Sequence, residues 1–433
     1  MLAAMATAPG PRDTGAIAPS RERGDACPGT LRLHAADDGA LARVRIPAGA
    51  LTTGQALALW DAAQRLGDGS LHLTSRGNVQ LRGLGEGCGR ELADVLGAAG
   101  LLPSPRHERV RNVVASPLSG LDGRCGADVQ PWARELDRLL CASEGATGLS
   151  GRFLFAFDDG RGDVAALGAD VTVQAAGGAA AVLRLGADDT GVSVRGDDAA
   201  RAVLLAAEAF LDAARDSGTR CWRVSELPGS TAELTIEVAS RMAADGIRGT
   251  LVSTPPTTVG DPPPPGAVVG PGGRTTALSV VAPLGVLTGA QWRELAAVAE
   301  HDGNGELRLT PWRGVILPGV EDATALASAG LITSPASPWL GVGACIGRPG
   351  CAKSLADVRA DAAKALGAGP ASLPVYWSGC ERRCGHPHGD WVDLVATADG
   401  YDISVHGERP CTGMPPSELA AIVAAARTSA VTR

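Results

Sequence analysis

The sequence predicts a duplicated α+β fold in which two similar halves are related by pseudo-twofold symmetry. Three observations support this prediction. A 34-residue segment recurs along the chain, strand and helix patterns follow the same order in both copies, and a Pro- and Gly-rich stretch lies between the copies. A long repeat that occurs in two copies is typical of a paired architecture rather than a solenoid. We therefore expect a functional site between the halves, because concave sites favour domain interfaces.

The repeat aligns residues 51–84 with residues 287–320 without a gap, at a constant offset of 236. Thirteen of the 34 positions are identical, and the match continues upstream, where Gly49 corresponds to Gly285. Unrelated segments share far fewer identities, so we infer an internal duplication. The stretch 255–273, PPTTVGDPPPPGAVVGPGG, is unsuited to a helix or a central strand, and we expect a linker there.

Each copy of the repeat predicts the order strand, helix, strand, strand, helix. Apolar runs at 41–46 and 277–282 indicate the first strands, and Thr52 and Thr288 are typical helix N-caps. This order favours a small sheet covered by helices on one face. The other expected elements are strands at 71–74 and 79–81 and helices at 91–99 and 323–329.

A different module follows each copy. Alternating apolar residues in it indicate several short strands and then a helix. In the first half, strands are expected at 153–157, 171–173, 182–185 and 192–194, and a helix at 199–216. In the second half, strands are expected at 375–377, 391–396 and 401–405, and a helix at 417–427. The modules thus alternate in the order A-B-A′-B′.

Composition narrows the class of protein. The chain has 433 residues, 45% of them hydrophobic, and a formal charge of −8, which argues against non-specific nucleic-acid binding. It contains no run of about 20 apolar residues, as a membrane-spanning helix needs, and it begins without a secretory-signal pattern. We therefore expect a cytoplasmic protein without a membrane partner. In that compartment, ten cysteines indicate metal or redox chemistry rather than a disulfide framework.

Four cysteines cluster near the C-terminus. Cys345 and Cys351 have the spacing C-x5-C, and Cys380 and Cys384 have the spacing C-x3-C. Four thiolates suit a [4Fe–4S] cluster or an all-thiolate zinc site. The wide first spacing favours the iron–sulfur cluster, because structural zinc sites use tighter pairs. The role of Cys27 stays open, and the five other cysteines are scattered and indicate small buried side chains.

Four motifs give the chain a family resemblance: LTSRGNVQLRG at 73–83, RNVVASPLSGLD at 111–122, ACIGRPGC at 344–351 and SGCERRCGHP at 378–387. With them the chain resembles the siroheme-dependent sulfite and nitrite reductase superfamily. Within that superfamily, the opening ACPGTLRL and the segment LTPWRGVILPG make it similar to the precorrin-3B synthase family. The resemblance extends over nearly everything after the first 25 residues.

The resemblance implies two ferredoxin-like half-domains and two α+β domains that bind the iron–sulfur cluster and a tetrapyrrole. We expect a flexible tail at 1–25, the first half-domain at 26–105, an α+β domain at 106–254, a linker at 255–273, the second half-domain at 274–335 and the cluster-binding domain at 336–433. It also implies a monooxygenase of cobalamin biosynthesis that converts precorrin-3A to precorrin-3B by hydroxylation and lactone formation, using O2 and reducing equivalents.

The macrocycle implied by the resemblance carries many carboxylates, which arginine binds with two parallel hydrogen bonds. Asn78, Gln80 and Arg82 alternate along one expected strand, so their side chains would point together into the cleft. The full set of expected substrate-binding residues is Arg76, Asn78, Gln80, Arg82, Arg111, Asn112, Arg313 and Arg348.

Oxygen activation needs a further group, because a cluster with four cysteine ligands transfers electrons and does not normally bind O2. A separate mononuclear non-haem iron would typically use two histidines and one carboxylate. The candidates beside the cluster are His386, His388 and Asp390. A dinucleotide fingerprint is absent from the sequence, so we expect an external electron donor, either a ferredoxin or an NADH-dependent reductase.

Two alternatives stay open at this point. The first is a siroheme-dependent sulfite or nitrite reductase, which has the same fold but an iron-bearing macrocycle. It needs several basic groups focused on a small anion, and the motif at 75–83 fits that need less well. The second is a zinc-stabilised binding module without catalysis. It would contain zinc and no iron.

Overall fold

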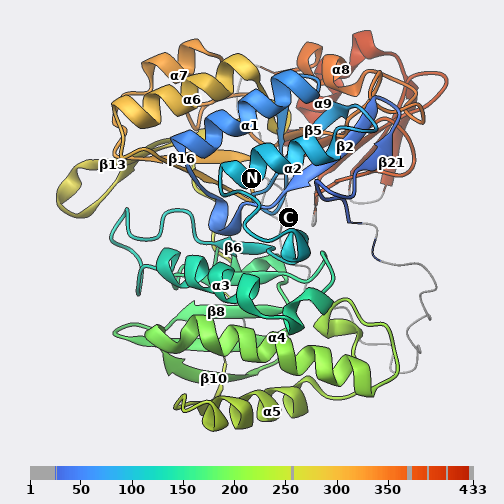
Figure 1. The fold of residues 1–433 in the computed structure, drawn as a ribbon. Coiled ribbons are helices and arrows are strands. Elements are labelled where there is room, and N and C mark those ends of the chain that lie inside the picture. Colours follow the sequence, from blue (N-terminus) through green and yellow to red (C-terminus); the bar gives the residue numbers. More distant parts are fainter. Residues whose placement is uncertain are drawn as a thin grey trace.

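The computed structural model describes residues 25, 27–254, 258–367, 373–387, 390–405 and 408–428. The tail expected at 1–25 therefore lies outside the described residues, except for Asp25. The described residues form four sheets, which we call A to D, and Figure 1 shows their arrangement. None of the helices in these parts of the chain combines the length and hydropathy needed to cross a membrane.

Sheets A and B belong to the duplicated half-domains, and each has the same strand order. Sheet A runs β1 (His34–Ala36), β2 (Gly39–Val44), β5 (Val79–Leu84), β4 (Ser70–Leu73) and β14 (Val286–Thr288). Sheet B runs β12 (Gly266–Val269), β13 (Thr275–Val281), β16 (Gly314–Pro318), β15 (Glu306–Leu309) and β3 (Ala50–Thr52). Each half thus contributes one edge strand to the sheet of the other half, β14 to sheet A and β3 to sheet B.

Helices cover one face of this pair of sheets, as expected. They are α1 (Thr53–Leu66), α2 (Gly89–Ala98), α6 (Gly289–His301) and α7 (Thr324–Ser328), with α1 and α6 side by side. Both halves share one apolar core. Trp292 of α6 is fully buried there, and its Nε1 donates to the Ala56 carbonyl of α1 at 2.7 Å. The halves are therefore one folded unit.

The duplication extends to backbone detail. Thr52 and Thr288 both form a capping box with the Gln three residues later, which confirms them as N-caps. Before each helix, a residue other than glycine has positive φ, Ala48 at 58° and Leu284 at 53°. The same tight turn thus precedes both helices.

Sheets C and D belong to the two modules that follow, and they begin alike, with two parallel pairings followed by antiparallel ones. Sheet C runs β11 (Thr250–Ser253), β10 (Thr190–Arg195), β9 (Ala180–Leu185), β8 (Val171–Ala175), β7 (Phe155–Asp158) and β6 (Val113–Ala115). Sheet D runs β17 (Val342–Ala344), β18 (Val375–Ser378), β19 (Val392–Ala396), β20 (Tyr401–Val405) and β21 (Glu408–Met414). The order A-B-A′-B′ is present.

Each module has its own core. Sheet C packs against α3 (Gln130–Ala142), α4 (Ala199–Asp216) and α5 (Thr231–Ala244). Sheet D packs against α8 (Val358–Lys364) and α9 (Leu419–Thr428). The expectation for 255–273 is wrong in part, because residues 266–269 are not linker but form β12 at the edge of sheet B. An edge position tolerates the neighbouring prolines, which cannot donate to a sheet ladder.

Candidate functional site

The four expected cluster cysteines lie on two loops that leave neighbouring parallel strands. Cys345 directly follows β17, and Cys380 lies two residues after β18. The loops are joined where the Gly379 N–H donates to Cys345 Sγ at 3.2 Å. An ideal Cβ on Gly379 would lie 1.9 Å from Ser354 Oγ, so only glycine allows this close approach. The fold therefore brings both cysteine pairs to one edge of sheet D.

The donor set fits an iron–sulfur cluster better than a single zinc ion. Sulfurs around one zinc ion lie about 3.8 Å apart, given Zn–S bonds of about 2.3 Å. Among the described residues, no three cysteine sulfurs lie within 4.8 Å of one another. A cube whose cysteines bind separate irons holds them farther apart. Cys384 is exposed, and its carbonyl accepts from the Tyr376 hydroxyl at 2.6 Å.

The first module has a counterpart of these loops that lacks thiols. The strand registers place Ser116 where Cys345 stands, and the Asp159 N–H donates to Ser116 Oγ at 3.2 Å. The end of β7 and the loop after it carry buried Asp158, Asp159 and Asp163, and Arg161 pairs with Asp159 at 2.7 Å. Carboxylates and an arginine thus occupy the pseudosymmetric position, and the thiol quartet belongs to the second half.

A row of polar side chains that includes several arginines, which we call the basic lane, crosses sheet A on the face opposite its helices. The register aligns Arg43, Gln80 and His72 across β2, β5 and β4. Their neighbours Val44 and Val79 point to the helix side, into the core. Burial lowers the pKa of His72, so its ring is neutral at pH 7. The Arg43 guanidinium has a buried Nε that finds no hydrogen-bond partner among the described residues.

One end of this lane meets the first module. Arg76 donates to the Arg152 carbonyl at 3.3 Å, and Arg45 donates to the Gly151 carbonyl at 3.0 Å. Neither arginine has an ion pair within the described parts of the chain. Burial lowers the pKa of Arg45 to about 9 and that of Arg76 to about 10. Desolvated cations of this kind favour an anionic ligand.

Cys27 borders the same end of the lane. Its β-carbon lies 2.9 Å from the ideal Cβ position of Gly151, and the Asp25 carboxylate accepts from the Gly151 N–H at 2.6 Å. Burial, together with Asp25, raises the pKa of the Cys27 thiol. The thiol is therefore protonated at neutral pH. The structure places Cys27 beside the basic lane, which the sequence did not predict.

The other end of the lane meets the cluster loops. Arg82 forms a two-pronged ion pair with Asp38, at 2.8 and 2.7 Å, and also donates to the Gly350 carbonyl at 3.3 Å. Arg359 of α8 donates to the Cys345 carbonyl at 3.1 Å. Arg82 is buried and internally bonded, so in this structure it holds the cluster loop in place.

Three expected substrate residues are deeply buried. Arg111 is clamped by Asp137 at 2.6 and 2.7 Å and donates to the Leu101 carbonyl. Asn78 and Asn112 bond to each other at 3.3 Å. These contacts join the half-domain to the first module. The substrate roles of all three residues stay predictions. In the structure, each of them forms hydrogen bonds within the protein.

The remaining expected residues lie at the cluster side. Arg348 is exposed, and its Nε donates to the Ser354 carbonyl at 2.7 Å. His386 is exposed and stacks on Trp391 with ring centroids 5.1 Å apart. Asp390 is exposed, and His388 lies outside the described residues. The iron-binding role of this triad therefore stays a prediction.

Sequence reasoning missed Arg43, Arg45, His72 and Arg359. Arg43 and Arg45 alternate in the strand segment ARVRIP, and that alternation was a usable signal. Arg359 lies on α8, a helix of seven residues that the sequence pattern did not reveal. The repeat does not align the two arginines of these turns with each other. Its register places Trp312 opposite Arg76, and Arg313 opposite Gly77.

Comparisons with known proteins agree on the fold. The family described as nitrite/sulfite reductase ferredoxin-like half domain matches residues 34–97 and 269–328, one stretch in each half. Among solved structures, the NirA protein of Mycobacterium tuberculosis has a TM-score of 0.66 at 18% identity. That match covers 93% of this chain and 83% of the other.

Two relatives match along most of the chain. A precorrin-3B synthase of Sinorhizobium sp. is 28% identical, over 93% of this chain and 86% of its own length. A ferredoxin–nitrite reductase of Synechococcus elongatus is 31% identical, over 85% of this chain and 80% of its own length. Both matches thus extend beyond the half-domains into the modules.

Proposed function

Because this chain belongs to the nitrite and sulfite reductase family, we propose that it is an iron–sulfur monooxygenase of the precorrin-3B synthase type, acting on precorrin-3A with O2. The observation that carries the proposal is the basic lane beside the cysteine quartet. Within the parts of the chain that the structure describes, it offers guanidinium groups without ion pairs along one face of a sheet rather than at a single point. A flat macrocycle with several carboxylates matches such a distribution.

The chain's own residues have three tasks in this reaction. Cys345, Cys351, Cys380 and Cys384 would hold a [4Fe–4S] cluster, which supplies one-electron transfer when bound. Arg43 and Arg76 bind carboxylates at the first-module end of the lane. Orienting the macrocycle at several points fixes which ring faces the cluster edge, and such fixed geometry is a large part of catalysis.

An external electron donor is part of this proposal. The exposed side chain of Cys384 gives a donor protein a short path to the cluster. For the metal that activates O2, the candidates His386, His388 and Asp390 stand as our proposal for a mononuclear non-haem iron. Electron supply and oxygen activation would then lie on one side of the molecule.

A siroheme-dependent sulfite or nitrite reductase is the second candidate. That chemistry concentrates basic groups on a small anion at the siroheme iron. Between the first module and the other half, Leu154, Val114 and Val164 pack with Trp312 in a buried apolar cluster, which offers no charged group to such an anion. Carboxylates spread around the rim of a macrocycle match the dispersed guanidinium groups of the basic lane better than one small oxyanion does.

The test is turnover by the anaerobically purified, cluster-containing protein. With precorrin-3A, a reductant and labelled dioxygen, we expect a product heavier by one labelled oxygen atom. Sulfite and nitrite, supplied with reduced viologen, are expected to give no turnover. Reduction of either anion without oxygenation of precorrin-3A would replace the leading proposal with the second.

A further inference from the structure

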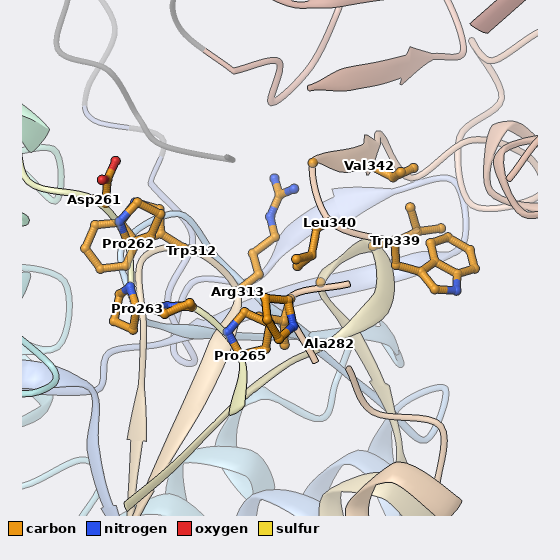
Figure 2. A pocket seen from close by; sticks show the side chains of 16 residues that line it. Asp261, Pro262, Pro263, Pro265, Ala282, Trp312, Arg313, Trp339, Leu340 and Val342 are labelled. Carbon is orange, nitrogen blue, oxygen red and sulfur yellow. The ribbon is translucent and has the colours of Figure 1, made fainter. Parts of the chain in front are cut away.

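A pocket of about 270 Å³ lies between the Pro-rich connection at 258–265 and the second half, and it contains Arg313, one of the expected substrate-binding residues. Pro262 and Pro263 form one side, and Leu340 and Val342 form part of the other, with Pro265 between them beside Ala282 (Figure 2). The volume falls just below the roughly 300–1,000 Å³ of pockets that take a whole drug-sized ligand. It is therefore suited to one edge of a larger molecule.

Arg313 extends into this pocket from a strained backbone position. Its φ is 61°, which glycine adopts freely and arginine does not, and the repeat places Gly77 there in the other half, with φ 63°. Its side chain crosses Gly285, whose ideal Cβ would lie 2.4 Å from Arg313 Cδ. Strain that is retained in this way commonly marks a functional residue.

The tip of Arg313 is close to the cluster module. Its Nη1 lies 3.6 Å from the ideal Cβ position of Gly343, two residues before Cys345. Within the described residues, the guanidinium has no hydrogen bond and no ion pair. Asp261 lines the pocket but does not pair with Arg313. The pocket thus combines flat apolar walls with one uncompensated cation.

We propose that this pocket receives one carboxylate-bearing edge of the tetrapyrrole, with Arg313 binding the carboxylate and the proline segment covering the adjoining pyrrole ring. This inference rests on the proposed function, since it concerns the same substrate. It gives the Pro-rich connection a role in recognition. It also fixes the orientation of the macrocycle, because Arg43 and Arg76 bind other carboxylates at the far end of the basic lane.

The experiment measures binding of uroporphyrin III, a stable metal-free macrocycle with eight carboxylates, to the cluster-containing protein by absorbance titration. The variants are Arg313→Gln and Arg313→Gly. The glycine variant removes the cation and also relieves the backbone strain, so it should fold at least as well as the wild type. Arg248→Gln, at an exposed arginine before β11, is the matched control, and Arg76→Gln reports on the other end of the lane.

We expect both Arg313 variants to bind uroporphyrin III about 10- to 100-fold more weakly, the usual loss for a charged hydrogen-bonding group. The control should keep wild-type affinity, and cluster absorbance and melting temperature should be retained. Wild-type affinity in both Arg313 variants, with loss in Arg76→Gln, would overturn the pocket and leave the proposed function standing. Loss of the cluster in both variants would show a structural role and also overturn it. Failure of the wild type to bind would overturn both proposals.

Discussion

Replacing Gly379 by alanine should separate the two cysteine loops and prevent cluster assembly. The added Cβ would lie 1.9 Å from Ser354 Oγ and 2.7 Å from Ser354 Cβ, whereas ordinary contacts begin at 3.4 Å. Rotating the hydroxyl away breaks its bond to the Ala356 carbonyl at 2.8 Å and costs about 1 kcal/mol. The carbon atoms would still be about 0.7 Å too close, a degree of overpacking that costs about 1–3 kcal/mol.

The combined cost of about 2–4 kcal/mol corresponds to a roughly 30- to 1,000-fold weaker hold on the cluster. The assay is iron and acid-labile sulfide per chain, with the visible absorbance, after anaerobic purification. Gly367→Ala is the matched control, because an added Cβ there meets nothing within 4 Å. Combining Gly379→Ala with Ser354→Gly leaves one contact at 3.3 Å and should restore much of the cluster. Full cluster content in Gly379→Ala alone would refute the reasoning.

Three further predictions concern stability. In denaturant unfolding, Trp292→Phe should lose about 1 kcal/mol, because its bond to the Ala56 carbonyl is removed, and Trp292→Ala should lose about 3–5 kcal/mol. No loss in Trp292→Phe would deny the bond a role. Thr52→Ala and Thr288→Ala should each cost about 1 kcal/mol, because the caps are equivalent. Burial raises the pKa of Asp163 to about 7, so the unfolding free energy should fall as pH rises from about 4 to 7. Asp163→Asn should flatten that fall.

Much of the fold follows from local pattern. The repeat at 51–84 and 287–320 predicts two half-domains, and the capping residues at 52 and 288 were identified because a cap needs only a few neighbouring residues. The exchange of β3 and β14 between sheets could not be predicted in this way. Strands of three residues carry little periodicity, and their partners lie more than 200 residues away in sequence.

The candidate site was only partly predictable, for a similar reason. The cysteine spacing depends on two short segments, so it was visible in the sequence. The choice among arginines depends on which carboxylates lie nearby in space. Arg82 and Arg111 match the expected motifs, yet Asp38 and Asp137 neutralise them. Arg43 lies in no motif, and only the fold shows that its Nε has no hydrogen-bond partner among the described residues.

We propose that four thiolates hold a [4Fe–4S] cluster beside a binding surface for a metal-free macrocycle, and the other proposals depend on this one. The most direct measurement is the metal, sulfide and siroheme content of the anaerobically purified chain. We predict about four to five irons and about four sulfides per chain, with no siroheme and no stoichiometric zinc. One siroheme per chain, or zinc in place of iron, would contradict the account.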